Sequence, residues 1–330
     1  MRVLFASLGS VGHTYPLIPL AIAARDAGHE VHWAAGAEVH PPLATLGLRP
    51  FRPADAFYEI YAEDLAPSLD LLRPDLVVHE WGLPGAAVAA AQAGIPGLWH
   101  GFGRMIPPGI GLQLPSLVDG AAGRPHLDIC PPSLQDKDFL ATGDRIELRP
   151  VPFSFPTGTA GAVRGSRPLV YLTLGTAFGT AALLTTAIKG LARLNVTVVV
   201  AAGRVPPEEI GAVPAGVTVS SWVPQAQLLP HADVVVHHGG SGTTLGALAA
   251  GVPQLFLPQG ADQFANADAV TAAGAGLRLD SAEVTADAVA SQVRALLAWD
   301  GPRDAARAVA AEIARMPAPD EVAHRLSDYA

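Results

Sequence analysis

Short runs of apolar residues, rich in valine and leucine, recur along the chain and alternate with longer stretches of helical periodicity. Such runs, bounded by glycine and proline, are typical of strands buried on both faces of a parallel sheet. In the first half they cover residues 2–7, 30–35, 74–80 and 94–100, with helices predicted over 14–27 and 83–93. This alternation predicts an α/β domain with helices on both faces of a parallel sheet.

The same rhythm restarts after residues 151–167, whose proline, glycine and threonine are typical of a linker. Strands are then predicted over 168–175, 196–203, 217–222, 232–238 and 252–258, and helices over 180–193, 241–250, 301–314 and 319–329. We therefore expect two Rossmann-like domains, 1–150 and 168–315, facing a cleft that binds the ligand at the carboxyl ends of the strands. We expect the C-terminal helix, about 316–330, to pack back on the first domain.

Composition narrows the class of protein. The net charge of −9 argues against a nucleic-acid partner, and half of the 330 residues are hydrophobic, which excludes a disordered chain. The single cysteine, Cys130, fits a reducing compartment. We find no signal peptide and no apolar run of membrane-spanning length, so we expect a cytoplasmic protein.

One segment, "VVHHGGSGTTLGALAAGVP" from Val235, combines a predicted strand, a glycine turn and a helix. A turn of this kind presents backbone N–H groups at a helix N-terminus, which binds an anion without a lysine. Ser241, Thr243 and Thr244 add hydroxyls, and the ring of His238 can reach a phosphate oxygen. The alternative is that the glycines only permit a tight turn.

The flanking residues "SWVPQAQLLPHADVVVHH" and "GVPQLFLPQGADQFANADAV" extend this segment into a longer pattern. The whole resembles the donor-binding motif of family 1 glycosyltransferases with the GT-B fold. The opening "GSVGHTYPLIPLAIAARDAGHEV" and the later "RPLVYLTLGT" resemble the first strands of that family's two domains, in its bacterial macrolide and polyketide branch. The resemblance covers nearly the whole chain and implies a hexosyltransferase that uses a nucleotide sugar.

The resemblance also implies roles for individual residues. Trp222 would stack on the nucleobase, Val223 would bond its edge through the backbone, and Gln225 would lie near the ribose. The remaining donor-site positions are Gly12, Gly175 and Thr176, then His238, Gly239, Gly240, Ser241, Gly242 and Thr243 for the diphosphate, and Asp262 and Gln263 for the sugar hydroxyls. Without the rest of the motif, Trp222 would be better interpreted as a core aromatic at a strand end, and Asp262 as a helix N-cap.

One departure from the family pattern concerns the donor. Gly246 stands where members that use UDP-glucose commonly carry a glutamate that clasps both ribose hydroxyls. A deoxyribose has no 2′-hydroxyl, so the absence of this carboxylate favours a dTDP-sugar over a UDP-sugar. The neutral "TTLGAL" also resembles the bacterial transferases that use dTDP-deoxysugars. The alternative is that Gly246 serves close helix packing.

An acceptor hydroxyl needs a general base, and an imidazole suits that task at neutral pH. His13, in "GSVGHTYP" after the first strand, occupies the family's base position; it could instead cap the next helix or bind phosphate. Glu80, at the end of "LVVHE", is expected to orient His13, although the longer side chain leaves their distance open. His29, His32, His40 and His324 fall in surface-like contexts, and His100 is only a neighbour of the acceptor site.

No cofactor and no metal site are expected. The string "DKD" at 136–138 formally matches a metal motif, but it falls in the irregular, proline- and glycine-rich stretch 101–143, so we interpret it as a solvated loop. We expect that long loop to be functional. The stretch 101–143 and the segment before residue 74 are both shorter than in other members of the family. This predicts an open acceptor site.

The main hypothesis is an inverting, metal-independent transferase that moves a sugar to a hydroxyl of a polyketide or macrolide aglycone. The alternatives are a catalytically silent nucleotide-sugar-binding helper of a transferase complex, and an epimerase acting on a nucleotide sugar. The presence of both His13 and Glu80 weighs against a helper, and the acidic and basic set that an epimerase wants is not found. The sequence leaves the acceptor, the sugar and homodimer formation open.

Overall fold

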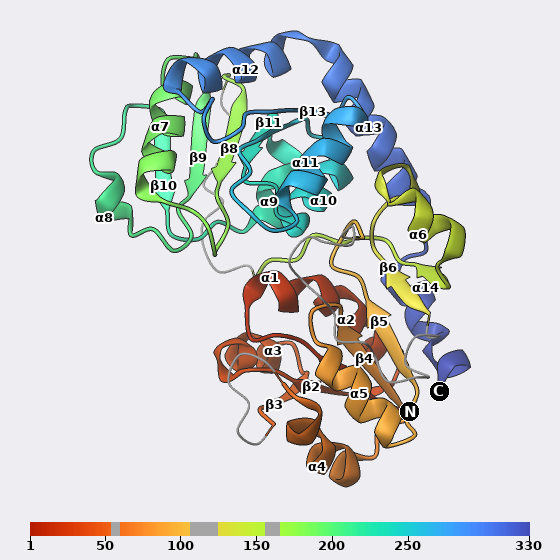
Figure 1. Ribbon diagram of the computed structural model, residues 1–330. Coiled ribbons are helices and arrows are strands. Elements are labelled where there is room, and N and C mark those ends of the chain that lie inside the picture. The colour runs from red at the N-terminus through yellow and green to blue at the C-terminus, as the bar shows by residue number, and fades with distance from the viewer. Residues whose placement is uncertain (54–59, 106–124, 156–165) are drawn as a thin grey trace. The chain divides into compact units, whose positions relative to one another are not determined.

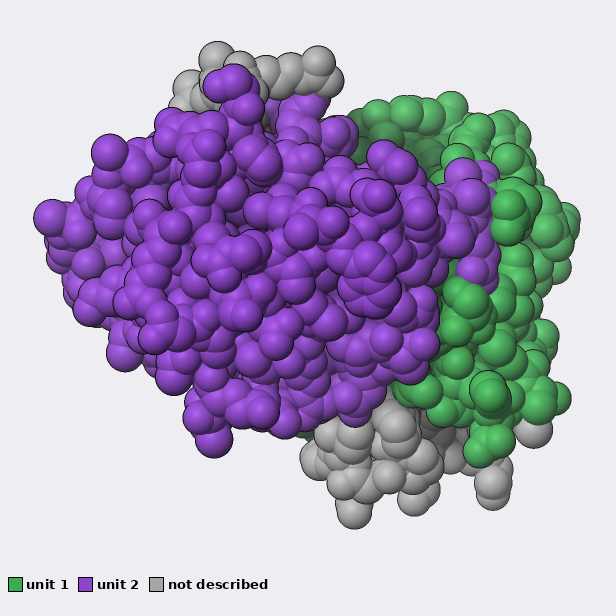
Figure 2. Space-filling view, turned by 90° about the horizontal axis from the view of Figure 1, so that it is seen from above, with its two compact units in different colours: residues 1–153, 315–330 green, residues 154–314 purple. Residues whose placement is uncertain are grey.

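The computed structural model describes residues 1–53, 60–105, 125–155 and 166–330. The chain divides into two compact units, residues 1–153 with 315–330 and residues 154–314, which are coloured separately in Figure 2. Each unit contains its own parallel sheet with helices packed on it (Figure 1). The α/β class with two Rossmann-like folds is therefore confirmed. The predicted segment 151–167 falls largely on residues outside the described ones.

The first unit is built on a sheet whose described strands run in the order β3-β2-β1-β4-β5-β6-β7, all parallel. The strands are β1 (Arg2–Ala6), β2 (Glu30–Ala34), β3 (Arg49–Phe51), β4 (Leu76–Glu80), β5 (Gly97–His100), β6 (His126–Asp128) and β7 (Arg145–Glu147). The helices are α1 (Val11–Thr14), α2 (Ile18–Asp26), α3 (His40–Thr45), α4 (Ala62–Leu72), α5 (Pro84–Gln92), α6 (Lys137–Thr142) and α14 (Pro319–His324).

The core of this unit follows from strands that are buried on both faces. In β1, Leu4 joins Leu65 of α4 and Ala86 of α5 in one buried cluster. The alternate residue Phe5 stacks on Trp33 of β2, with ring centroids 5.4 Å apart. The C-terminal helix α14 lies against α2, where the His29 ring is 3.3 Å from the carbonyl oxygen of Ala323.

The second unit has a sheet in the order β10-β9-β8-β11-β12-β13 among the described strands, again all parallel. Its strands are β8 (Leu169–Thr173), β9 (Thr197–Ala201), β10 (Val217–Ser220), β11 (Val234–His237), β12 (Gln254–Phe256) and β13 (Gly276–Arg278). Its helices are α7 (Ala181–Leu191), α8 (Pro207–Ile210), α9 (Gln225–Leu228), α10 (Ser241–Ala249), α11 (Gln263–Ala272), α12 (Ala286–Ala298) and α13 (Asp300–Arg315), which ends in the first unit.

Both sheets contain a point at which the strand order reverses. In the first unit β1 lies between β2 and β4, and in the second β8 lies between β9 and β11. At such a point the connections leave the two neighbouring strands toward opposite faces, so a crevice opens beyond their carboxyl ends. The loops after β1, β4, β8 and β11 are therefore the places where a site is expected.

The stretch 101–143 differs from the irregular loop that its composition suggested. Within its described part lie the strand β6 and the helix α6. Asp136 of "DKD" is the N-cap of α6, and its carboxylate accepts from the backbone N–H groups of Asp138 and Phe139 at 3.1 Å. The interpretation of "DKD" as a solvated loop was wrong, because a carboxylate bonded to first-turn amides begins a helix.

Candidate active site

His13 is carried by the short helix α1, directly after the first strand. The turn before it is fixed by Thr14, whose hydroxyl donates to the carbonyl oxygen of Leu8 at 3.0 Å and lies 3.0 Å from the Ser7 hydroxyl. The indole N–H of Trp33 donates to that same Ser7 hydroxyl at 3.0 Å. These buried contacts fix the loop after β1. The backbone that carries His13 is therefore held in place by buried hydrogen bonds.

Glu80 ends β4, the strand beside β1, and its carboxylate meets His13. The distance from Glu80 Oε1 to His13 Nδ1 is 3.1 Å. The backbone N–H of Gly82 donates to Glu80 Oε2 at 2.7 Å. The Glu80 side chain is 1% exposed and that of His13 is 28% exposed. A buried carboxylate thus orients a ring that still reaches solvent, which is the arrangement a general base requires.

Phe102 is a member of this site that the sequence did not single out. Its ring stacks on the His13 imidazole, with centroids 4.9 Å apart and planes 26° apart. The contact holds the ring of His13 on one face while Glu80 holds its Nδ1 edge. Phe102 follows the end of β5, next to β4 in the sheet, and only the strand order brings it to His13.

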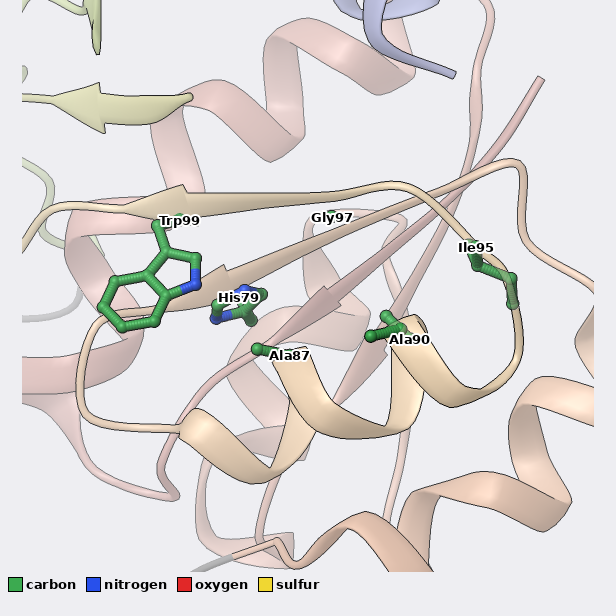
Figure 3. Close-up of a pocket in the computed structure, with 7 residues that line it drawn as sticks. His79, Ala87, Ala90, Ile95, Gly97 and Trp99 are labelled. Carbon is green, nitrogen blue, oxygen red and sulfur yellow. The ribbon is translucent and has the colours of Figure 1, made fainter. Parts of the chain in front are cut away.

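Figure 3 shows a small cavity between α5 and the strands β4 and β5, with His79 beside Trp99. Its volume of about 10 Å³ is the space of one water-sized sphere, so it cannot hold a sugar or an aglycone. It is lined by His79, Ala87, Ala90, Ala91, Ile95, Gly97 and Trp99. Burial lowers the pKa of His79 to about 4, so this histidine is neutral at pH 7.

Two other buried histidines of this unit, His100 and His126, are also held neutral. Burial lowers the pKa of His100 to about 4. Burial, together with electrostatic repulsion from His100, His79 and Arg145 when the rings are protonated, lowers the pKa of His126 to about 3. His100 Nδ1 lies 2.8 Å from the Gly101 carbonyl oxygen. Contrary to the expected surface contexts, His32 is only 12% exposed and lies 3.1 Å from Glu30, and His40 Nε2 lies 2.9 Å from the Ala35 carbonyl oxygen.

In the second unit, His238 follows β11 and its ring lies between two glycines. A Cβ added to Gly175 would lie 2.5 Å from His238 Cε1, and one added to Gly240 would lie 2.6 Å from His238 Nε2. Gly175 also has a φ of +69°, a conformation that other residues rarely adopt. Burial lowers the pKa of His238 to about 4, so the ring is neutral at pH 7, and among the described residues its Nδ1 has no hydrogen-bond partner.

The helix α10 begins at Ser241 with Gly240 as its N-cap, and no side chain caps its first-turn amides. Gly242 is exposed, and no atom lies within 4 Å of the position where its Cβ would be. The hydroxyls of the turn bond within the protein: Thr244 donates to the Gly240 carbonyl oxygen at 3.0 Å and Thr243 to Gln225 Oε1 at 3.2 Å. The first-turn backbone amides, rather than the hydroxyls, are therefore the donors that no side chain caps.

Asp262 and Gln263 lie at the start of α11 and are both buried. Asp262 occupies the N-cap position, yet its side chain makes no capping bond. Its Oδ2 accepts instead from the Ser241 hydroxyl at 2.7 Å. Gln263 Oε1 accepts from the backbone N–H groups of Gln259 and Gly260 at 2.8 and 3.2 Å. Asp262 thus ties the start of α11 to the start of α10, and Gln263 fixes the loop after β12.

Trp222 lies beyond the carboxyl end of the edge strand β10 and is half-buried. Val223 is buried in the core cluster that contains Tyr171 and Val235. Gln225 begins α9 and is joined to α10 by the Thr243 hydroxyl. The structure therefore brings Gln225, Thr243 and the glycine turn together within one unit. Gly12 is exposed, with open space where its Cβ would be.

Across the described ranges, no group of three or more histidine, cysteine, aspartate or glutamate side chains is arranged to hold a metal ion. The same part of the chain contains no helix that is both long and apolar enough to span a bilayer.

Two doubly wound parallel sheets, with a His–Glu pair after one reversal point and an open helix N-terminus after the other, define a protein of the GT-B class. Residues 185–329 match the family model described as erythromycin biosynthesis protein CIII-like, C-terminal domain. The chain is 34% identical to L-demethylnoviosyl transferase of Streptomyces niveus, over 99% of this chain and 98% of that protein. It belongs to the family of natural-product glycosyltransferases.

Solved structures agree with this assignment. The crystal structure of the glycosyltransferase SnogD from Streptomyces nogalater superimposes with a TM-score of 0.84 at 29% identity, covering 99% of each chain. Spinosyn rhamnosyltransferase SpnG complexed with thymidine diphosphate superimposes with a TM-score of 0.79 at 27% identity, covering 99% of this chain and all of that one. Both likenesses extend over the two units.

Proposed function

We propose that this chain transfers a sugar, from a dTDP-sugar, to a hydroxyl of a natural-product aglycone such as a polyketide or macrolide, with inversion at the anomeric carbon. The observation that carries the proposal is the 3.1 Å contact between His13 Nδ1 and Glu80 Oε1 beyond β1 and β4. A carboxylate accepts, so Nδ1 carries the proton and Nε2 keeps a lone pair. That lone pair is the base of the reaction.

The donor is held by the second unit. The first-turn amides of α10, with its dipole, bind the diphosphate. Neutral His238, whose ring is also hydrogen-bonded to the Thr173 backbone, packs beside that turn and holds its shape. Open space at Gly242 admits the phosphate. Trp222 stacks on the base, and Asp262 and Gln263 bind the sugar from the loop after β12. No metal ion is needed, because the N-terminus of α10 stabilises the negative charge of the diphosphate, which a cation would otherwise do.

Transfer then follows as one displacement. His13 Nε2 takes the proton of the acceptor hydroxyl, and the acceptor oxygen forms its bond to the anomeric carbon. The bond from that carbon to the diphosphate oxygen breaks, and the nucleoside diphosphate leaves with the electron pair. Glu80 stabilises the imidazolium that forms, as in other histidine–carboxylate pairs.

The choice of a deoxyribose donor is based on Gly246, which is buried in α10 and offers no carboxylate for a ribose 2′-hydroxyl. The related SpnG structure contains thymidine diphosphate. Calorimetric titration should give a dissociation constant for dTDP no weaker than that for UDP. A clear preference for UDP would contradict the deoxysugar donor and leave the transferase itself untouched.

The proposal as a whole is tested by nucleotide release from a dTDP-sugar with and without a polyketide aglycone, in buffer containing EDTA. We expect release that depends on the acceptor and persists in EDTA. Binding without turnover against a panel of aglycones would favour a non-catalytic helper. Activity that EDTA abolishes and Mg²⁺ restores would contradict metal independence.

A further inference from the structure

His237, the buried neighbour of His238, has a defined set of partners that the donor site does not explain. Its Nε2 lies 2.7 Å from Gln254 Oε1 on β12, and its Nδ1 lies 3.2 Å from the backbone nitrogen of Gly239. The side chain is 0% exposed, so it cannot touch a donor in this structure. Its effect on a ligand must pass through the residues that it bonds.

The hydrogen bonds around His237 fix which nitrogen carries the proton. A backbone N–H can only donate, so His237 Nδ1 is the acceptor for Gly239. Gln254 Nε2 donates to the Thr244 carbonyl oxygen at 3.3 Å, which turns its Oε1 toward His237. His237 Nε2 therefore donates. Burial, together with nearby His238, lowers the pKa of His237 to about 3, so this neutral tautomer holds at pH 7.

The other side of Gly239 is held by Asn266 on α11. Asn266 Nδ2 lies 2.9 Å from the Gly239 carbonyl oxygen, 3.0 Å from Ser241 Oγ and 2.9 Å from Asp262 Oδ2. Gly239 itself has a φ of +101°, and a Cβ there would lie 2.8 Å from the Gln263 carbonyl oxygen. The peptides on both sides of Gly239 are thus bonded to buried side chains, in a backbone conformation that requires glycine.

From this geometry we infer that His237 and Asn266 are positioning residues of the donor site. They turn the Gly239 N–H inward and its carbonyl toward α11, and this sets the direction in which the following amides of α10 point. The inference rests on the proposed function, since it concerns the turn that binds the diphosphate. Gly239 then shapes the turn through its backbone conformation and does not bind the diphosphate itself, because its N–H already donates to His237 Nδ1.

Two substitutions at His237 separate positioning from packing. In His237→Asn, the amide oxygen falls near the place of Nδ1 and can still accept from Gly239. In His237→Gln, the amide falls near the place of Nε2 and can bond Gln254, but Gly239 N–H loses its acceptor and is left buried without a partner, which is costly. Both variants lose ring packing, so both should have lower thermal midpoints.

The measurement is the dissociation constant for dTDP by calorimetry on the full chain, well below the thermal midpoint of each variant. We expect His237→Gln to bind at least about tenfold more weakly, a loss of about 1.4 kcal/mol, and His237→Asn to stay within about threefold of the unaltered protein. Equal weakening in both, or unchanged binding in His237→Gln, would overturn the inference. Absence of dTDP and UDP binding by the unaltered protein would instead overturn the proposed function.

Asn266→Ala gives a second route if the His237 variants do not fold. It removes the donor to the Gly239 carbonyl oxygen and should weaken dTDP binding about tenfold. Asp268→Asn is the matched control, because Asp268 is exposed on the same helix and pairs with Arg278. Binding by Asn266→Ala that equals the control would show that the turn keeps its shape without Asn266 and would overturn its part in the inference.

Discussion

The carboxylate of Glu80 lies between two hydrogen-bond donors, with Oε1 3.1 Å from His13 Nδ1 and Oε2 2.7 Å from the backbone nitrogen of Gly82. Gly82 makes the second contact possible, since a Cβ there would lie 3.1 Å from Oε1. The carboxylate is therefore fixed before any substrate arrives, and it fixes the imidazole in turn. Preorganisation of this kind is what a base and its orienting group require.

Replacement of His13 by alanine should lower turnover by roughly 10²–10⁴-fold, the usual contribution of general-base catalysis. The dissociation constant for dTDP should change little, because we propose that the second unit holds the donor. Steady-state kinetics with an aliphatic alcohol acceptor, paired with calorimetry, measures both. A near-normal rate with such an acceptor would mean that His13 is a structural residue of α1.

Glu80→Gln should also lower turnover, by less than His13→Ala. The amide keeps the size of the side chain and can still accept from His13 Nδ1, but it has no charge to stabilise the imidazolium. Asp70→Asn, on the exposed side of α4, is the control and should leave the rate unchanged. If Glu80→Gln and the control have the same rate, the carboxylate has no part in the reaction.

His238→Ala should weaken dTDP binding, since it removes a ring that fills the space between Gly175 and Gly240 and so supports the turn that we propose binds the diphosphate. We expect a loss of about tenfold or more. Exposed His231, in the same unit, provides the control His231→Ala. Equal affinities for the two variants would show that His238 faces away from the donor.

The protein should begin to lose stability near pH 6.5, well above the pH at which carboxylates begin to titrate. Burial lowers the pKa of His79, His100 and His238 to about 4 and contributes to values of about 3 for His126 and His237. Below about pH 6.5 the unfolded chain binds protons that the folded chain does not. The free energy of unfolding should therefore fall as the pH falls from about 6.5 toward 4, with a limiting slope of about 1.4 kcal/mol per pH unit for one such histidine.

Urea unfolding at pH 7, 6 and 5 measures this slope. His126→Gln should make the slope shallower, and the surface variant His324→Gln should leave it as it is. A free energy of unfolding that stays constant or rises between pH 7 and pH 5 would contradict the expected uptake of protons on unfolding.

The sequence by itself determined the two sheets, because runs such as 2–7 and 232–238 are short and have apolar, valine-rich centres, a pattern that favours strands buried on both faces. It also placed His13, Glu80 and the glycine turn at strand ends, since that follows from the order of elements alone. It missed β3, β6, β7 and β13, which have three residues each and include proline or charged residues, so their periodicity is too weak to detect.

Only the tertiary structure decided which polar groups meet. The Ser241 hydroxyl bonds Asp262, 21 residues away, and His237 bonds Gln254, 17 residues away. Phe102 reaches His13 because β5 lies beside β4 and β4 beside β1. Burial, rather than any local pattern, makes His238 neutral. Such contacts depend on strand order, strand register and helix packing, which join residues far apart in sequence and leave no periodic trace within it.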